Sequence, residues 1–368
     1  MKTGGPSGIF PARMIEALAE AGAIKANPGI EAAQVQPASL DLRLGKRAWR
    51  VRASFLPGPE ATVAERIEAL KLHEIDLTKG AVLERGCVYI APLIERLKLP
   101  EDVSVAANPK SSTGRLDIFT RVIADRARAF DSAEAGYAGP LYLEISPRTF
   151  PVLVRTGSRL SQIRFRRGDT RLSADEHRKL HASETLVFGK RAMIGEGVSL
   201  SIDLKGAGKG QVIGFRSKRF TSVIDVDKSG ALDVLDFWEP LTDRGQGSLI
   251  LDPDEFYILV SREAVHVPPD YAAEMVPFDP LVGEFRVHYA GFFDPGFGHA
   301  AAGGRGSRAV LEVRSREVPF LVEHGQIIGR LVYERMAGRP DVLYGAGLGS
   351  NYQAQTLKLS KHFKPFTR

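Results

Sequence analysis

Short runs of β-branched and aromatic residues alternate with polar residues along most of this chain. The runs are bounded by Gly, Pro and Asp, which is typical of strands joined by tight turns. We expect strands at Leu141–Ile145, Val152–Val154 and Ser161–Phe165, and again at Ala309–Val313, Phe320–Val322 and Ile327–Tyr333. Many short strands at this spacing predict a mainly β protein, built as a β-barrel or jelly-roll-like sandwich.

A helical pattern is found in only a few places. The clearest predicted helix starts near Pro11, has Ile15 and Leu18 on its apolar face and stops at Gly22. A second predicted helix runs from about Ser173 to about His181, and Ser173 and Glu176 have the spacing of a capping box. The helices are therefore accessory to the strands.

An internal repeat organises the chain. Residues 142–157 and 310–325 are identical at 7 of 16 positions, an offset of 310 − 142 = 168, and the same offset relates residues 88–90 to residues 256–258. Residues 39–42 resemble residues 201–204 at an offset of 201 − 39 = 162. Such self-similarity predicts two tandem copies of one domain, and the glycines between residues 184 and 197 put the boundary near residue 190. We expect domains at residues 1–190 and 191–368.

Composition narrows the class of protein. The chain has 368 residues, a formal charge of +6 and a single cysteine, Cys87. One cysteine forms neither an internal disulfide nor a Cys-rich zinc site, and we expect it to be an inert core residue. Neither a signal peptide nor an apolar run of transmembrane length is evident, so we expect a cytoplasmic protein without a membrane partner. Basic residues are interspersed with acidic ones, which favours a small polyanion such as a nucleotide over nucleic acid.

The segment from Lys110 to Arg115 has the groups that a phosphate needs. Two adjacent hydroxyls stand between two cations, and a glycine allows close backbone approach; the residues are Lys110, Ser111, Ser112, Gly114 and Arg115. A Ser/Gly-rich surface turn is the alternative. The second copy has Asp279 and Glu284 at the corresponding place, and carboxylates repel phosphate, so we expect the two copies to have divided their functions.

Each copy also places a glutamate among core-forming residues of a strand, Glu144 in the first and Glu312 in the second. Either glutamate can instead point outward or form an ion pair with Arg148 or Arg316. Aromatic turns precede both strands. The second copy has an Asp-Pro-Gly turn with Asp294 and Phe297, which can hold a flat ring, and the first copy offers Asp131 and Tyr137.

Taken together, several segments resemble the dCTP deaminase branch of the trimeric dUTPase superfamily. They are Gln36–Gly45, Leu97–Pro100, Lys110–Arg115, and a Gly-aromatic pair followed by Leu-Glu. The resemblance implies hydrolysis of dCTP to dUTP and ammonia without catalytic zinc, in the supply of dTTP precursors. It also implies Mg²⁺ bound through the triphosphate, a homo-oligomer with a trimer-like arrangement of domains, and dTTP as a candidate inhibitor. The zinc deaminases need a Pro-Cys-x-x-Cys segment that one cysteine cannot supply.

The resemblance also assigns roles to residues. It implies that Ser111, Ser112 and Arg115 bind the triphosphate and fix the water, and that Glu144 or Glu312 is the general base. It implies a base and deoxyribose pocket at Asp294 and Phe297, or less well at Asp131 and Tyr137. A C-terminal arm that closes over the phosphates would carry Tyr352, Gln353, Gln355 and Lys358.

Several alternatives remain open. The base can be Glu312, so that the reaction uses both copies, or Glu144, with the second copy largely structural. The chain can be a bifunctional dCTP deaminase and dUTP diphosphatase, in which Asp131 would aim water at a phosphorus. It can also be a nucleotide-binding regulator without catalysis. Elsewhere, we expect the pair His177 and His181 to be solvated, and residues 164–167 to form a solvated strand edge.

Overall fold

The computed structural model describes residues 5–188, 193–206, 208–277, 285–287, 291–315, 317–345 and 357–366. The chain forms two compact units. Unit 1 comprises Met1–Thr170, Phe220–Ser229 and Met336–Asp341, and unit 2 comprises Arg171–Arg219, Gly230–Arg335 and Val342–Arg368. Two short segments that follow Thr170 in the sequence therefore pack with unit 1.

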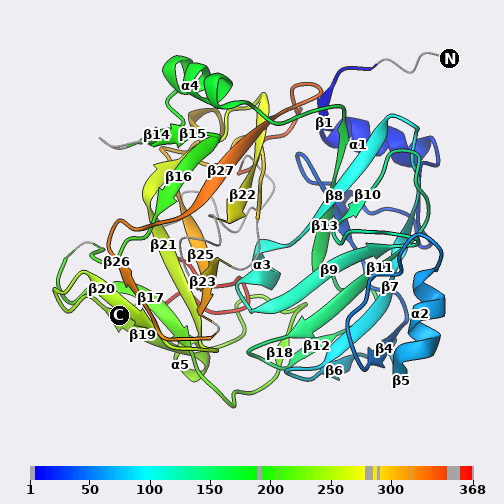
Figure 1. The fold of residues 1–368 in the computed structure, drawn as a ribbon, viewed down its shortest axis with the longest axis horizontal. Coiled ribbons are helices and arrows are strands. Elements are labelled where there is room, and N and C mark those ends of the chain that lie inside the picture. Colours follow the sequence, from blue (N-terminus) through cyan, green and yellow to red (C-terminus); the bar gives the residue numbers. More distant parts are fainter. Residues whose placement is uncertain are drawn as a thin grey trace. The chain divides into compact units, whose positions relative to one another are not determined.

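Unit 1 is built from two main antiparallel sheets (Figure 1). The first has the order β1 (Gly8–Ile9), β13 (Ser161–Arg167), β8 (Val103–Pro109) and β10 (Ser132–Ala133), with β3 (Leu40–Leu42) also on β13. The second has the order β5 (Lys71–Asp76), β4 (Arg47–Val51), β7 (Val88–Lys98), β11 (Ala138–Pro147) and β9 (Ile118–Ala124), with β2 (Ile24–Lys25) on β7.

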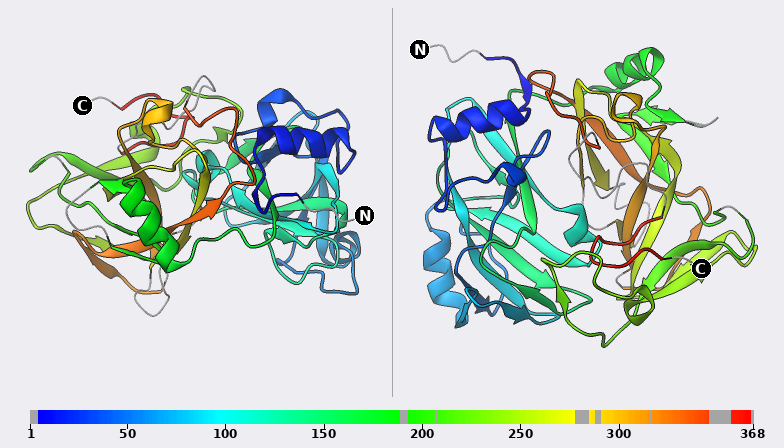
Figure 2. Two further views of the ribbon diagram at one scale, coloured as in Figure 1. Left: turned by 90° about the horizontal axis from the view of Figure 1, so that it is seen from above. Right: turned by 180° about the vertical axis from the view of Figure 1, so that it is seen from behind.

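Two helices of unit 1, α1 (Ala12–Glu20) and α2 (Val63–Leu70), lie against the outside of these strands (Figures 1 and 2). The single turn α3 (Ser111–Gly114) follows β8 directly, and the 3₁₀ turn η1 (Ala32–Gln34) precedes β3. Helix α2 begins with a capping box, in which Thr62 and Glu65 bond to each other's backbone N–H groups. Its buried side chains, Val63 and Ile67, pack on the core of the second sheet. Burial of this face therefore fixes the helix.

A short segment of unit 1, Phe220–Ser229, is held to the first copy by backbone and charge. Strand β18 (Ile224–Asp225) pairs in parallel with β12 (Val152–Val154), which pairs on its other side with β6 (Ala81–Leu83). Beside these strands Arg155 donates to both oxygens of Asp225, at 2.6 and 2.8 Å. The bidentate ion pair lowers the pKa of Asp225 to about 2.

This ion pair predicts an acid-sensitive attachment. The pKa of Asp225 is lower in the folded chain than its ordinary value of 3.8, so its stabilisation is complete above about pH 4 and is lost as pH falls towards 2. We expect a contribution on the order of 1–2 kcal/mol, because the Arg155 side chain is one third exposed and partly screened. Asp225→Asn should weaken the hydrogen-exchange protection of β12 and β18 at pH 5. The loss of protection that the unsubstituted chain shows between pH 4 and 2.5 should be absent in this variant. Asp175→Asn, at an exposed position, is the control, and an equal effect there would contradict the assignment.

Unit 2 has the same kind of architecture. One sheet has the order β19 (Trp238–Thr242), β17 (Val212–Ser217), β21 (Phe256–Val265), β25 (Ser307–Ser315) and β23 (Phe285–Val287), with β14 (Val187–Phe188) on β21. The other has the order β15 (Ile194–Gly195), β16 (Gly197–Ser201), β27 (Ile327–Arg335), β22 (Tyr271–Pro277) and β24 (Phe292–Phe293). A separate pair is β20 (Ser248–Leu251) with β26 (Phe320–Glu323), and the helices are α4 (Ala174–Ser183), α5 (Val234–Phe237) and the 3₁₀ turn η3 (Ala300–Ala302).

The strand pairing shows that the two units repeat each other residue by residue. Glu144 pairs with Ile90 and Glu312 with Ile258, and both members of the second pair lie 168 positions after those of the first. A buried tyrosine hydroxyl follows the same rule. Tyr89 Oη accepts from Glu84 N and Tyr257 Oη accepts from Asp252 N, each at 3.0 Å. The mainly β fold with a duplicated domain is thus confirmed.

One part of the predicted repeat is wrong. Leu42 pairs with Ser161 in unit 1, and Leu200 pairs with Gly329 in unit 2, so the offset there is 200 − 42 = 158 and not 162. Residues 39–42 and 201–204 have similar sequences but are not structurally equivalent, because Asp203 lies beyond the end of β16. Its Oδ1 accepts from the N–H groups of Lys205 and Gly206, each at 3.0 Å, as in a tight turn.

The expected strands and the helices near Pro11 and Ser173 are confirmed, but three local predictions are wrong. His177 is fully buried and not solvated. Its Nε2 accepts a hydrogen bond from the backbone N–H of Tyr333 at 3.0 Å, which satisfies the ring in the interior. Cys87 is partly exposed, since it lies just before β7 and not inside it. Arg164 is only 1% exposed, because β13 runs inside its sheet between β8 and two short strands.

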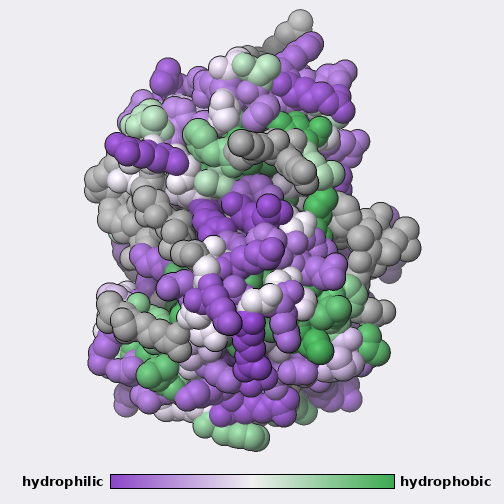
Figure 3. All heavy atoms as spheres, turned by 90° about the vertical axis from the view of Figure 1, so that its left-hand side faces the viewer, coloured by the Kyte–Doolittle hydropathy of each residue, from purple (hydrophilic) through white to green (hydrophobic). Residues whose placement is uncertain are grey.

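One face of the molecule shows how polar and apolar residues are distributed on the surface. On the face drawn in Figure 3, hydrophilic residues predominate and hydrophobic ones form small separate patches. Among the described residues, no helix combines the length and the apolar character needed to cross a membrane.

Candidate active site

The predicted phosphate-binding segment forms a tight helical turn at the end of β8. Lys110 N donates to Leu160 O at 3.0 Å, and Lys110 O accepts from the N–H groups of Thr113 and Gly114 at 2.8 and 3.0 Å. After the turn, Asp117 accepts a 2.6 Å hydrogen bond from the Thr149 hydroxyl. The bonds to Leu160 and Thr149 tie the two ends of the turn to the residue before β13 and to the loop that follows β11, so the turn is held in place.

The groups of this turn differ in exposure. Ser111 and Lys110 are partly exposed, whereas Ser112 and Arg115 are 7% and 4% exposed. Lys110 forms an ion pair with the buried Asp41 of β3, which orients the lysine from the neighbouring strand. A partly exposed hydroxyl between a buried arginine and a partly exposed lysine suits a bound polyanion.

The first strand glutamate, Glu144 in β11, is 1% exposed and its neighbours Leu143 and Ile145 are fully buried. Its Oε1 accepts two hydrogen bonds from Arg121 of β9, 3.1 Å from Nε and 2.7 Å from Nη2. The predicted alternative partner, Arg148, is wrong: Arg148 is exposed, and Arg121 pairs with Glu144 through the register of β9 and β11.

Arg121 is itself held tightly. Its guanidinium lies 3.5 Å from the centroid of the Phe130 ring and 4.8 Å from that of Phe119, and Nη2 donates to the Ser54 hydroxyl at 2.6 Å. Stacked arginines are preorganised for bidentate or paired contacts to carboxylates. Glu144 Oε1 is therefore engaged in a rigid ion pair, while its Oε2 is buried without a hydrogen-bond partner.

Glu312 occupies the equivalent position of unit 2, in β25 next to β21. It is 7% exposed, between Leu311 and Val313, which are at most 1% exposed. The carboxylate is thus nearly as buried as that of Glu144. Burial of a carboxyl group in an apolar strand is the environment that tunes such groups for proton transfer.

The two aromatic turns are structurally equivalent. Tyr137 N donates to Glu134 O at 3.2 Å and Phe297 N to Asp294 O at 3.1 Å, and both turns contain a glycine with positive φ. Asp294 therefore corresponds to Glu134, and Tyr137 to Phe297. Asp131 lies outside the turn, where its Oδ1 accepts from Val122 N at 2.8 Å.

The aromatic residues of the two turns have different surroundings. The Tyr137 hydroxyl donates to Pro140 O at 2.6 Å, and burial raises the pKa of Tyr137 to about 12. Phe297 is 5% exposed and packs edge-on against Phe293, with ring centroids 4.9 Å apart. Phe297 thus anchors the second turn in the apolar core of unit 2, whereas the Tyr137 hydroxyl hydrogen-bonds to the backbone of its own turn.

Part of the predicted site lies outside the described residues. This applies to Tyr352, Gln353 and Gln355 of the C-terminal arm and to residues 278–284. Lys358 is described and exposed. The sequence analysis did not identify Arg121, stacked on Phe130, as the partner of Glu144. The available signal was an arginine inside the apolar run of residues 118–124, which needs a buried partner as much as a strand glutamate does.

Comparison with known proteins gives the family. Residues 6–169 match the family model of the 2'-deoxycytidine 5'-triphosphate deaminase (DCD) N-terminal domain, and residues 173–363 match that of the C-terminal domain. A solved structure, the 2'-deoxycytidine 5'-triphosphate deaminase from Agrobacterium tumefaciens, is 65% identical with a TM-score of 0.89, and the match covers 94% of this chain and 100% of that one.

Curated relatives match over a shorter stretch. The dCTP deaminase of Halorubrum lacusprofundi is 33% identical over 135 residues, 36% of this chain and 63% of that protein. A dCTP deaminase of Dictyoglomus thermophilum described as dUMP-forming is 31% identical over 133 residues, 36% of this chain and 66% of that one. The match spans less than two thirds of the length of either relative. Two family models over nearly the whole chain are decisive: the chain belongs to the dCTP deaminase family.

Proposed function

We propose that this chain is a hydrolase that converts dCTP and water to dUTP and ammonia. The observation that carries the proposal is the combination, in a dCTP deaminase fold, of a rigid Ser-Ser-x-Gly-Arg turn with a buried strand glutamate. The reaction needs these two groups in particular. One must hold a triphosphate, and the other must move a proton between water and the departing amine.

Ser111, Ser112 and Arg115 are proposed to bind the triphosphate. The serine hydroxyls donate to phosphate oxygens, and the planar guanidinium binds two oxygens at once. Mg²⁺ enters with the nucleotide and supplies further positive charge to the phosphates. Lys110 adds charge from the edge of the turn, in a place set by Asp41.

Glu312 is proposed to be the general base. It takes a proton from the water that attacks C4 of cytosine, and it delivers a proton to the 4-amino group, which leaves as ammonia. Support comes from the state of its counterpart. Glu144 Oε1 accepts two hydrogen bonds from the stacked Arg121, which leaves only Oε2 of that carboxylate for a water molecule.

Asp294 and Phe297 are proposed to shape the pocket for the base and the deoxyribose. Phe297 is buried against Phe293 in the core of unit 2 and anchors the turn, whose backbone polar groups are proposed to meet the edge of the pyrimidine. The proposed reaction then combines phosphate-binding residues of the first copy with base-binding and catalytic residues of the second, either from the same chain or from neighbouring chains of an oligomer.

The proposed function is tested by product analysis of the untagged full chain. EDTA-treated and then Mg²⁺-supplemented protein is incubated with dCTP, and ammonia, dUTP, dUMP and pyrophosphate are measured together. Ammonia and dUTP in equal amounts are expected. Nucleotide binding without any turnover would overturn the proposal in favour of a regulator.

A second candidate is the bifunctional enzyme, because the Dictyoglomus thermophilum relative is described as dUMP-forming. In that case dUMP and pyrophosphate accompany ammonia. The suspected carboxylate is Asp131, but its Oδ1 is occupied by the backbone N–H of Val122. We therefore favour the dUTP-forming reaction, and the same product analysis distinguishes the two.

Arg115→Lys should raise the KM for dCTP by about 10–100-fold and change kcat by less than about fivefold. A lysine keeps the charge but loses the bidentate contact, which costs about 1.5–3 kcal/mol. Steady-state kinetics with dCTP measures both constants. Arg148→Lys, at an exposed arginine of the same unit, is the matched control. An unchanged KM for Arg115→Lys would remove this residue from the triphosphate site.

A further inference from the structure

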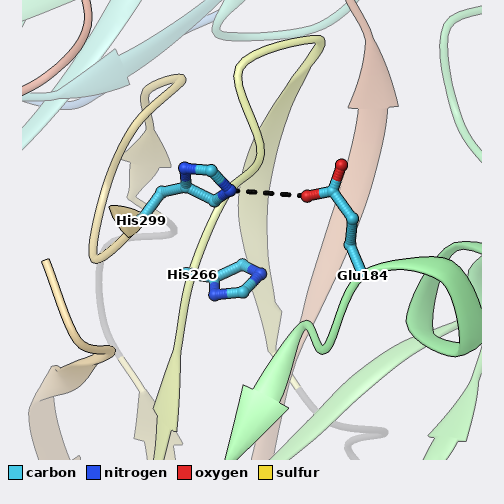
Figure 4. A group of neighbouring side chains, drawn as sticks. All are labelled: Glu184, His266 and His299. Atoms are coloured by element: carbon cyan, nitrogen blue, oxygen red, sulfur yellow. Dashed lines mark ion pairs between the residues drawn. The ribbon is translucent and has the colours of Figure 1, made fainter. Parts of the chain in front are cut away.

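Among the described residues, Glu184, His266 and His299 of unit 2 place one potential metal-ligand atom each within 4.8 Å of the others. Figure 4 shows the two imidazole rings stacked edge to face on one side and the Glu184 carboxylate on the other, with a ring nitrogen of each histidine directed towards it. None of the three has a role in the proposed reaction. Nitrogen and carboxylate donors in this combination suit a divalent transition metal.

The three residues are held in place by the backbone around them. Glu184 caps the end of α4, where its N–H donates to Leu180 O at 2.7 Å. His266 directly follows β21 and donates its N–H to Leu186 O at 3.1 Å. His299 caps η3, and its carbonyl accepts from Gly304 N at 2.8 Å. The backbone of all three residues is therefore held by hydrogen bonds at the ends of α4, β21 and η3.

His266 gives the strongest support for a metal site. The residue is 8% exposed, and its Nε2 is buried without a hydrogen-bond partner. A neutral imidazole with a free lone pair is the form that binds metal ions.

The distance from His299 Nε2 to Glu184 Oε2 is 3.4 Å. This is long for a charge-assisted hydrogen bond, for which about 2.7–2.9 Å is usual. It matches the separation of about 3.4 Å between two ligands on a tetrahedral zinc ion with bonds of about 2.0–2.1 Å. The remaining distances must shorten, and the Glu184 side chain, which is 45% exposed, is free to swing inward.

One hydrogen bond opposes the metal. His299 Nδ1 accepts from Ala301 N at 3.1 Å, which places the ring proton on Nε2. Metal binding at Nε2 moves this proton to Nδ1 and breaks the cap. Ala301 is exposed, so water can accept its N–H.

We propose that Glu184, His266 and His299 form a binding site for one divalent transition-metal ion, with Zn²⁺ as the best match, and that the ion links the end of α4 to β21 and η3. Three protein ligands leave a fourth position for water. The site has a structural role and no step in the deamination.

The test uses the untagged, EDTA-treated full chain and zinc sulfate, by competition with a chromophoric chelator. We expect one Zn²⁺ per chain, and Co²⁺ in its place should show the visible absorption of a four-coordinate site. His299→Gln and Glu184→Gln should each weaken zinc binding at least tenfold, whereas His73→Gln, at an exposed histidine of unit 1, should leave it unchanged. His266→Gln is a third variant, and the first two keep the test decisive if it fails to fold.

Two results would overturn the metal site: less than one tenth of a zinc ion per chain at micromolar free zinc, or binding that none of the three substitutions weakens. Ammonia release from dCTP by the EDTA-treated chain is measured separately. Failure of the metal site would leave deamination intact, and failure of deamination would leave zinc binding unchanged, so the two proposals are judged independently.

Discussion

Glu312→Gln should lower kcat for dCTP deamination by about 10²–10⁴-fold, with little change in the KM for dCTP. The amide keeps the size of the side chain but cannot accept the proton of the attacking water. Glu144→Gln should retain kcat within about threefold, because Arg121 already holds Glu144 in an ion pair. Ammonia release under saturating dCTP measures the difference.

Two controls keep this comparison interpretable. Thermal unfolding of both variants separates loss of chemistry from loss of fold, since Glu144→Gln leaves the largely buried Arg121 with a weaker partner. Arg121→Gln removes the other half of the same pair and should also retain activity. Full activity of Glu312→Gln, or loss of turnover confined to Glu144→Gln, would reverse the assignment of the base.

Glu95→Ala should lower the free energy of unfolding of unit 1 by about 3–5 kcal/mol. Glu95 is fully buried, and its carboxylate accepts from Arg43 Nε at 2.8 Å, Arg43 N at 2.9 Å and Gln34 Nε2 at 2.9 Å. Removing it leaves a guanidinium that is 2% exposed without its main counter-charge. Hydrogen exchange of β3 and β7, followed by mass spectrometry, reports the stability of this part of the chain.

The matched control is Glu74→Ala, which removes an exposed partner 3.7 Å from Arg47 in the same unit and should cost less than about 1 kcal/mol. The double variant Arg43→Met with Glu95→Leu should recover most of the loss, because apolar residues of similar volume replace a buried ion pair at little cost. A loss below about 1 kcal/mol for Glu95→Ala would show that Arg43 finds other partners.

The strands and the duplication were predictable because they depend on local patterns. Val152–Val154 coincides with β12, and the 168-residue offset reappears in the pairing of Glu144 and Glu312. A period-2 run identifies a strand, and a repeated run identifies a repeated strand. The sequence carries this information directly.

Register and side-chain partners were harder to predict. The segment with Asp203 looked equivalent to that with Asp41, but Asp203 lies after its strand whereas Asp41 lies inside β3. A similar string of letters carries no information on which residue faces a neighbouring strand. The partner of Glu144 had the same difficulty, because Arg121 lies 23 positions away in sequence and meets it only through strand pairing.

The assignment of the base is tested most directly by a crystal structure of the full-length Glu312→Gln variant with dCTP and Mg²⁺. We expect phosphate oxygens bound to Ser111, Ser112 and Arg115, and cytosine C4 beside the side chain at position 312 with a water between them. A cytosine ring beside Glu144, with the Arg121 ion pair opened, would contradict it.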